Sequence, residues 1–200
     1  MSLININYKD YPECMFAILA ACLPASEGSE LRRVAGKVVF KSEDKDGNTY
    51  RNGLLHSFDD IPALRIGSQK EWYKNGKRHR DGDKPALINH NRQEWWVNGK
   101  HHREGDLPAV VNDFSEFWYK NGILHREGDL PAAVSAGNQI WTKNGVFHRE
   151  GDKPAIILGE RLEWWINGKR HRDGEPALID PDEGIQEYWI NGEFISALQE

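Results

Sequence analysis

The sequence predicts an all-β protein: an elongated single antiparallel sheet of repeated β-hairpins with a short helical cap at the N-terminus. Three observations support this fold class. An Asn-Gly dipeptide recurs every 23 residues, an aromatic pair precedes it in most copies, and residues 1–48 do not repeat. A fixed period of this length indicates units that pack on their neighbours. We therefore divide the chain into a cap, residues 1–48, and an array of about six units plus a partial one, residues 49–200.

The Asn-Gly dipeptide marks each unit, with an interval of 23 residues five times and then 24. Between short runs of aromatic and β-branched residues it predicts a hairpin, because a type I′ turn needs positive φ at both central residues. Each unit then supplies at least two short strands, and at about 4.8 Å per strand the array would be roughly 60 Å long. The dipeptides begin at Asn52, Asn75, Asn98, Asn121, Asn144, Asn167 and Asn191.

Two aromatic ladders precede the turns, and they should lie on opposite faces because successive strand residues point in opposite directions. We expect the first, uniform ladder to form the core and the second, more varied one to be more exposed. The first contains Trp72, Trp95, Trp118, Trp141 and Trp164. The second contains Tyr73, Trp96, Tyr119, Thr142, Trp165 and Trp189.

The non-repeating segment predicts a helix followed by a strand. An Asp10-Tyr-Pro-Glu start leads into an apolar run that Pro24 ends, which is typical of a helix, and residues 37–41 are typical of a strand. An alternative reading takes Leu19-Ala-Ala-Cys22 as a lipoprotein cleavage box, although Asp10 and Glu13 disfavour an export leader. We expect a cytoplasmic protein, with lipid anchoring through Cys22 as the minor alternative.

Composition excludes several function classes. The two cysteines, Cys14 and Cys22, would lie about 12 Å apart on a helix, too far for a disulfide, which fits a reducing compartment. A formal charge of -5 disfavours a nucleic-acid-binding protein, which needs a basic face. No run approaches the roughly 20 apolar residues that span a bilayer.

The unit EWYKNGKRHRDG resembles the MORN repeat, the membrane occupation and recognition nexus. Period, aromatic, turn dipeptide and a later glycine agree over about three quarters of the chain, and the match is closest to divergent variants of the family. The resemblance implies a scaffold that binds proteins or lies near membranes, and not an enzyme fold. The array also resembles hypothetical proteins of large bacteriophages and giant viruses, which implies a phage or viral source. The chain departs from the family in an added Asp-x-Pro-Ala and in arginines where the family commonly has its first glycine after the turn: Arg80, Arg103, Arg126, Arg149 and Arg172.

Two polar ladders could carry chemistry. The histidines should lie about 10 Å apart in neighbouring units, too far to share one zinc ion, so we expect structural residues and no metal or other cofactor. Each arginine precedes an acidic residue, so we expect ion pairs between adjacent units, with presentation of the arginines to an acidic partner as the alternative. The histidines are His79, His102, His125, His148 and His171.

The uniformity of the units disfavours an enzyme, which needs an asymmetric constellation of catalytic groups. We expect a non-enzymatic scaffold that binds another protein or a second copy of itself, because pairs such as Ile156 and Ile157 place apolar residues on both sides of the sheet. The alternative is a small-ligand, cell-envelope or membrane-surface binder that uses aromatic shelves. The candidate partner-binding residues are Tyr73, Trp96, Tyr119, Arg103, Arg126 and Arg149.

Overall fold

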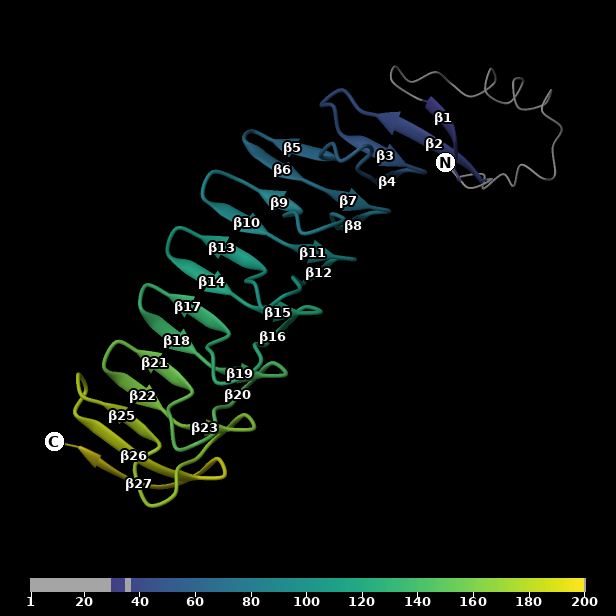
Figure 1. The fold of residues 1–200 in the computed structure, drawn as a ribbon. Coiled ribbons are helices and arrows are strands. Elements are labelled where there is room, and N and C mark those ends of the chain that lie inside the picture. Colours follow the sequence, from purple (N-terminus) through teal and green to yellow (C-terminus); the bar gives the residue numbers. More distant parts are fainter. Residues whose placement is uncertain (1–29, 35–36, 200) are drawn as a thin grey trace. The chain divides into compact units, whose positions relative to one another are not determined.

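The computed structural model describes residues 30–34 and 37–199, and all secondary structure in these ranges is β-strand (Figure 1). The repeated antiparallel hairpins confirm the predicted fold class. The helix expected between Asp10 and Pro24, and both cysteines, lie outside the described residues. The chain forms two compact units, Met1–His90 and Asn91–Glu200, each of which is described by itself.

The first unit contains the lead-in strands and the first hairpins. The expected strand at residues 37–41 is part of β2, and an Asn-Gly turn at Asn52 joins β3 to β4. One sheet has the order β1-β2-β3-β4, β5, β6 and β9 pair in series, and β7 pairs with β8. The bounds are β1 Glu30–Val34, β2 Lys37–Glu43, β3 Thr49–Arg51, β4 Leu54–Leu55, β5 Leu64–Ile66, β6 Gln69–Glu71, β7 Tyr73–Lys74, β8 Lys77–Arg78 and β9 Leu87–Ile88.

The second unit contains one continuous sheet and a separate column of Asn-Gly hairpins. Ten strands form the sheet in the order β27-β26-β25-β22-β21-β18-β17-β14-β13-β10. These strands are β10 Arg92–Glu94, β13 Val110–Asn112, β14 Ser115–Phe117, β17 Ala133–Ser135, β18 Asn138–Ile140, β21 Ile156–Leu158, β22 Arg161–Glu163, β25 Leu178–Asp180, β26 Ile185–Ile190 and β27 Glu193–Gln199. The hairpins are β11 Trp96–Val97 with β12 Lys100–His101, β15 Tyr119–Lys120 with β16 Ile123–Leu124, β19 Thr142–Lys143 with β20 Val146–Phe147, and β23 Trp165–Ile166 with β24 Lys169–Arg170.

A complete repeat therefore has two hairpins and four short strands, and the Asn-Gly hairpin lies beside the continuous sheet (Figure 1). The tryptophan of the first ladder connects the two. The Trp118 backbone N–H donates to the carbonyl of Ala132, while its own carbonyl accepts from the N–H of His125. Its backbone groups thus bond to the next sheet hairpin on one side and to its own loop on the other.

The first aromatic ladder forms the core, as predicted. Its five tryptophans are between 4% and 8% exposed, and the alanine of each Asp-x-Pro-Ala segment, such as Ala132, is fully buried. The second ladder is half-buried at most positions and buried at Thr142. Rigid indole rings therefore replace the aliphatic layers of an ordinary core, which fits the abundance of tryptophan in the sequence.

Successive Asn-Gly turns stack through backbone hydrogen bonds. The N–H of Gly145 donates to the carbonyl of Leu124 in the preceding repeat at 3.2 Å. Gly145 has a φ of 82°, and a Cβ there would lie 3.0 Å from Cγ2 of Ile123. The glycine thus serves two purposes: it permits the left-handed turn and it leaves room for the preceding hairpin.

Gly145→Ala should therefore destabilise the protein more than the same change at a glycine with only the conformational requirement. Gly137 is the matched control, because its φ is 86° and nothing lies within 4 Å of a Cβ there. We expect losses in unfolding free energy of about 1 kcal/mol for Gly137→Ala and about 2 kcal/mol for Gly145→Ala, measured by urea denaturation. Equal losses would mean that the approach of Ile123 is unimportant.

Candidate functional site

The arginine ladder joins adjacent repeats. The Arg126 guanidinium lies 3.8 Å from the ring centre of Trp118, and its Nε and Nη2 donate to the carboxylate of Asp106, 20 residues earlier, at 2.8 and 2.9 Å. Its Nη1 donates to the carbonyl of Pro131 at 3.4 Å. Arg149 and Arg172 make the same three kinds of contact, and their carboxylates, Asp129 and Asp152, also belong to the preceding repeats. Stacking on a buried indole fixes the guanidinium, so this ion-pair ladder is part of the repeat interface.

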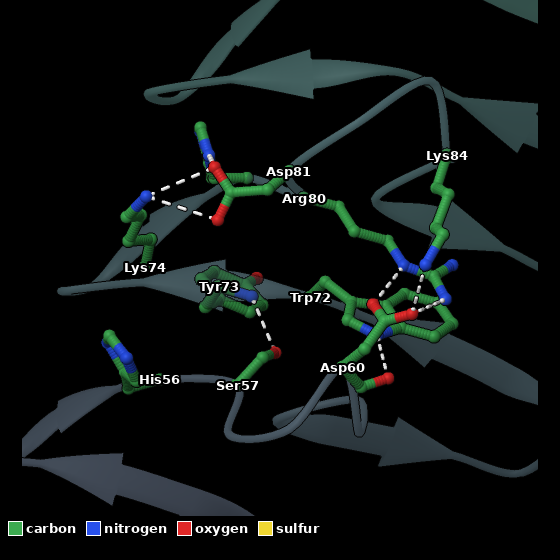
Figure 2. Close-up of a pocket in the computed structure, with 10 residues that line it drawn as sticks. His56, Ser57, Asp60, Trp72, Tyr73, Lys74, Arg80, Asp81 and Lys84 are labelled. Carbon is green, nitrogen blue, oxygen red and sulfur yellow. Dashed lines mark hydrogen bonds and ion pairs between the residues drawn. The ribbon is translucent and has the colours of Figure 1, made fainter.

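The same arrangement in the first unit borders a shallow pocket of about 210 Å³ (Figure 2). Arg80 and Lys84 both bond to the Asp60 carboxylate, and together they hold the pKa of Asp60 well below its usual range. Lys74 and Asp81 form a second pair at 3.1 Å. Most of the charge in the pocket is therefore ion-paired, with three cationic side chains against two carboxylates.

Comparable grooves recur between the loops of the second unit. One of them, of about 560 Å³, is lined by Arg126, Asp129, Trp141 and Arg149 among others. Arg149 and Lys153 bond to the Asp129 carboxylate and lower its pKa to about 2. This groove therefore repeats the ion-paired arrangement of the first unit, in which an arginine and a lysine bond to one aspartate.

The histidine ladder supports the next turn. The Nδ1 atom of His125 accepts the backbone N–H of Asn144 at 3.1 Å, and its Nε2 lies 3.0 Å from the Glu127 carboxylate. An Nδ1 that accepts an N–H leaves the ring proton on Nε2, facing the carboxylate. Within residues 30–34 and 37–199, no three His, Cys, Asp or Glu side chains group closely enough to hold a metal ion.

The second aromatic ladder surrounds buried carboxylates. Trp96 Nε1 donates to Glu94 at 2.7 Å, and His101 Nε2 lies 2.9 Å from the same carboxylate. The His101 ring lies between Trp96 and Tyr119, with ring centres at 3.7 and 4.9 Å. Burial raises the pKa of Glu94, but the hydrogen bonds from His101 and Trp96 and the nearby Arg92 lower it to about 2.

This depressed pKa predicts an acid-dependent loss of stability. The folded-state pKa of about 2 is below the ordinary value of 4.5, so the stabilisation from ionised Glu94 is present above pH 4.5 and is lost as pH falls toward 2. We expect the unfolding free energy to fall over this range, and to fall less steeply in Glu94→Gln. Urea denaturation at a series of pH values measures both slopes, and equal slopes would contradict the prediction.

Sequence reasoning missed a pairing across each Asn-Gly hairpin. At Glu71, Glu94 and Glu163, each four residues before the asparagine, the residue three after the asparagine is cationic or a histidine. The last repeat departs from this pattern, because Glu187 has Phe194 at that position and pairs with Arg170 of the preceding hairpin. Arg78 and Arg170 bond directly to their glutamates. In the two middle repeats both positions are apolar instead: Phe117 with Leu124, and Ile140 with Phe147. Comparing the copies position by position would have revealed this signal.

The continuous sheet of the second unit has one buried and one half-exposed face. On the buried face lie Val110 and Ile156, at 2% and 7% exposure. On the other face, the central residues of neighbouring strands pair directly and form a row from β13 to β25. In order, the row contains Val111, Glu116, Val134, Gln139, Ile157, Leu162 and Ile179. We call the half-exposed residues Val111, Val134, Ile157, Leu162 and Ile179 the aliphatic row. The predicted apolar residues on both sides of the strands are thus observed at Ile156 and Ile157.

The predicted binding residues are distributed over both units. Tyr73, in the first unit, donates its hydroxyl to Glu71 at 2.7 Å, while Trp96 and Tyr119 belong to the His101 stack of the second unit. Arg103 stacks 3.7 Å above Trp95, and Arg126 and Arg149 are bonded as described above. None of these six side chains belongs to the aliphatic row.

Comparison with known proteins returned no matching family model, no matching curated protein and no matching solved structure. In the described part of the chain, no helix has the length and apolar character to cross a membrane.

Proposed function

We propose that this chain is a non-enzymatic scaffold that binds another protein through the aliphatic row of residues 91–200. The observation that carries the proposal is the half-exposed run of aliphatic side chains across successive strands of one sheet face. The row is contiguous at Ile157, Leu162 and Ile179, and Glu116 and Gln139 separate its other members. An exposed apolar patch with polar neighbours is typical of a protein interaction surface. Backbone hydrogen bonds connect its strands to the rest of each repeat, so the surface has its shape before a partner binds.

The row favours a macromolecule over a small ligand. Its residues lie on strand centres, whereas small molecules need concave sites that enclose most of their surface. Alternate strands are about 10 Å apart, and every seventh residue of an α-helix advances about 10.5 Å. The partner that fits is therefore an amphipathic helix with an apolar residue at each seventh position. We also propose that the chain is related to MORN repeats, because it shares their period, their aromatic position and their Asn-Gly turn.

The test compares two triple-lysine variants in affinity purification from a lysate of the native host. Val134→Lys/Ile157→Lys/Ile179→Lys changes the row. Leu107→Lys/Phe114→Lys/Leu130→Lys adds the same charge at apolar residues that are 42%, 75% and 46% exposed outside it. We expect a stoichiometric protein that the wild type and the control capture and the row variant loses, with unchanged circular dichroism. Capture of the same proteins by both variants, or of none by the wild type, would reject the proposal.

A further inference from the structure

Among the described strands, β27 lies at one edge of the sheet of the second unit. It is the terminal strand in the sheet order, and β26 is its pairing partner among the described strands. It has seven residues, whereas the other described strands of this sheet, apart from β26, have three. All seven residues are exposed, including Phe194 at 54%, Ile195 at 58% and Leu198 at 54%.

Such an edge normally carries features that prevent pairing with another chain. An edge strand has a row of N–H and C=O groups without partners, and proteins usually protect it with lysine, proline, short length or a covering segment. β27 has no lysine, arginine or proline, and its only charged residue is Glu193. A bulge shifts the register between Tyr188 and Trp189, opposite the first half of β27, and leaves Ser196–Gln199 regularly paired.

The sequence of β27 is self-complementary in an antiparallel register centred on Ser196. In that register Phe194 lies opposite Leu198, Ile195 opposite Ala197, and Glu193 opposite Gln199. Apolar residues then pair with apolar residues and no like charges face each other, which are the conditions that stabilise cross-strand pairs. A two-fold axis at Ser196 would satisfy both edges at once, as in an isologous dimer.

We propose that β27 pairs with β27 of a second copy of this chain, joining the sheets of the two copies into one. Residues opposite each other in an antiparallel pair point to the same side, so both copies present the same face. Leu198 pairs with Gln186, which pairs with Ile179 of the aliphatic row. In the dimer each row would therefore lead through Gln186 and Leu198 to Phe194 of the second copy. This inference does not depend on the proposed function, because a dimer can form whether or not the row binds a protein.

Sedimentation equilibrium of the full chain tests the proposal. We expect the wild type to form dimers and Ile195→Lys/Leu198→Lys to be monomeric, because lysine on an edge opposes strand addition. Leu107→Lys/Phe114→Lys is the control with the same added charge, and it should remain dimeric. Circular dichroism and thermal unfolding verify that each variant is folded. A monomeric wild type at all concentrations, or a dimer that the edge lysines do not dissociate, would overturn the proposal.

A cysteine at the two-fold axis tests the register. In a Cys14→Ser/Cys22→Ser background, Ser196→Cys would face its own copy with Cα atoms about 4.5 to 5.5 Å apart, which is within disulfide reach. We expect mild oxidation to give a covalent dimer with Ser196→Cys and none with Phe114→Cys, a residue 75% exposed in the turn between β13 and β14. Equal cross-linking of both variants, or capture of a different protein by Ser196→Cys in place of a second copy, would contradict self-pairing.

Discussion

Replacing Trp141 by alanine should lower the free energy of unfolding by about 3 to 5 kcal/mol, the usual cost of removing a large buried aromatic side chain. Trp141 is 5% exposed, and the Arg149 guanidinium stacks 3.6 Å from its ring centre. The change removes both the core contact and the surface that positions the arginine for its bonds to Asp129. Urea denaturation followed by circular dichroism measures the loss.

Phe114→Ala is the control, because Phe114 is 75% exposed and its removal should change stability by less than about 0.5 kcal/mol. A loss at Trp141 as small as that at Phe114 would mean that the tryptophan ladder is not the core. Unlike the same change in an ordinary globular domain, the loss of Trp141 should affect different parts of the chain unequally. Because each repeat contacts only its neighbours, repeats next to Trp141 should lose hydrogen-exchange protection before distant ones.

Phe117→Glu should destabilise the protein by about 3 kcal/mol, because it places a carboxylate among apolar residues without a partner. Phe117 pairs with Val110 and Ala133 across the sheet, and Leu124 stands at the position across the hairpin that holds arginine in other repeats. Tyr119 occupies the repeat position of Tyr73, whose hydroxyl bonds to Glu71, so it would offer the new carboxylate one hydrogen bond but no positive charge. Urea denaturation at neutral pH measures the effect.

The second change, Leu124→Arg, should restore more than half of that loss. Phe117→Glu/Leu124→Arg reproduces the Glu71, Tyr73 and Arg78 set of the first unit, in which the guanidinium and the phenol both bond to the carboxylate. Leu124→Arg alone completes the double-mutant cycle and should itself be destabilising. If the two single losses simply add, the pairing across the hairpin is not an energetic unit.

Much of the fold could be predicted from local signals. The Asn-Gly turns were predictable because positive φ at two successive residues restricts the sequence strongly, and both Asn144 and Gly145 have positive φ. The buried tryptophan ladder was predictable because the residue type repeats without variation. The second hairpin of each repeat was not resolved, because strands of two or three residues are too short to show a period. The aliphatic row could be predicted only in part. Ile156 and Ile157 indicated apolar residues on both faces of the strands, but the pairing register determines which residues of neighbouring strands lie side by side.

The sequence by itself determined the repeat, the turns and the residue types of the core, because these depend on interactions within one unit. Only the tertiary structure decided what the polar ladders do. Arg126 stacks on Trp118 in its own repeat while it bonds to Asp106 in the preceding one, and His125 accepts the N–H of Asn144 in the next. Such contacts depend on the offset between neighbouring units, which no single copy of the repeat encodes. The exposed edge of β27 likewise follows from the sheet order. The sequence of a strand does not show whether neighbouring strands pair with one of its edges or with both.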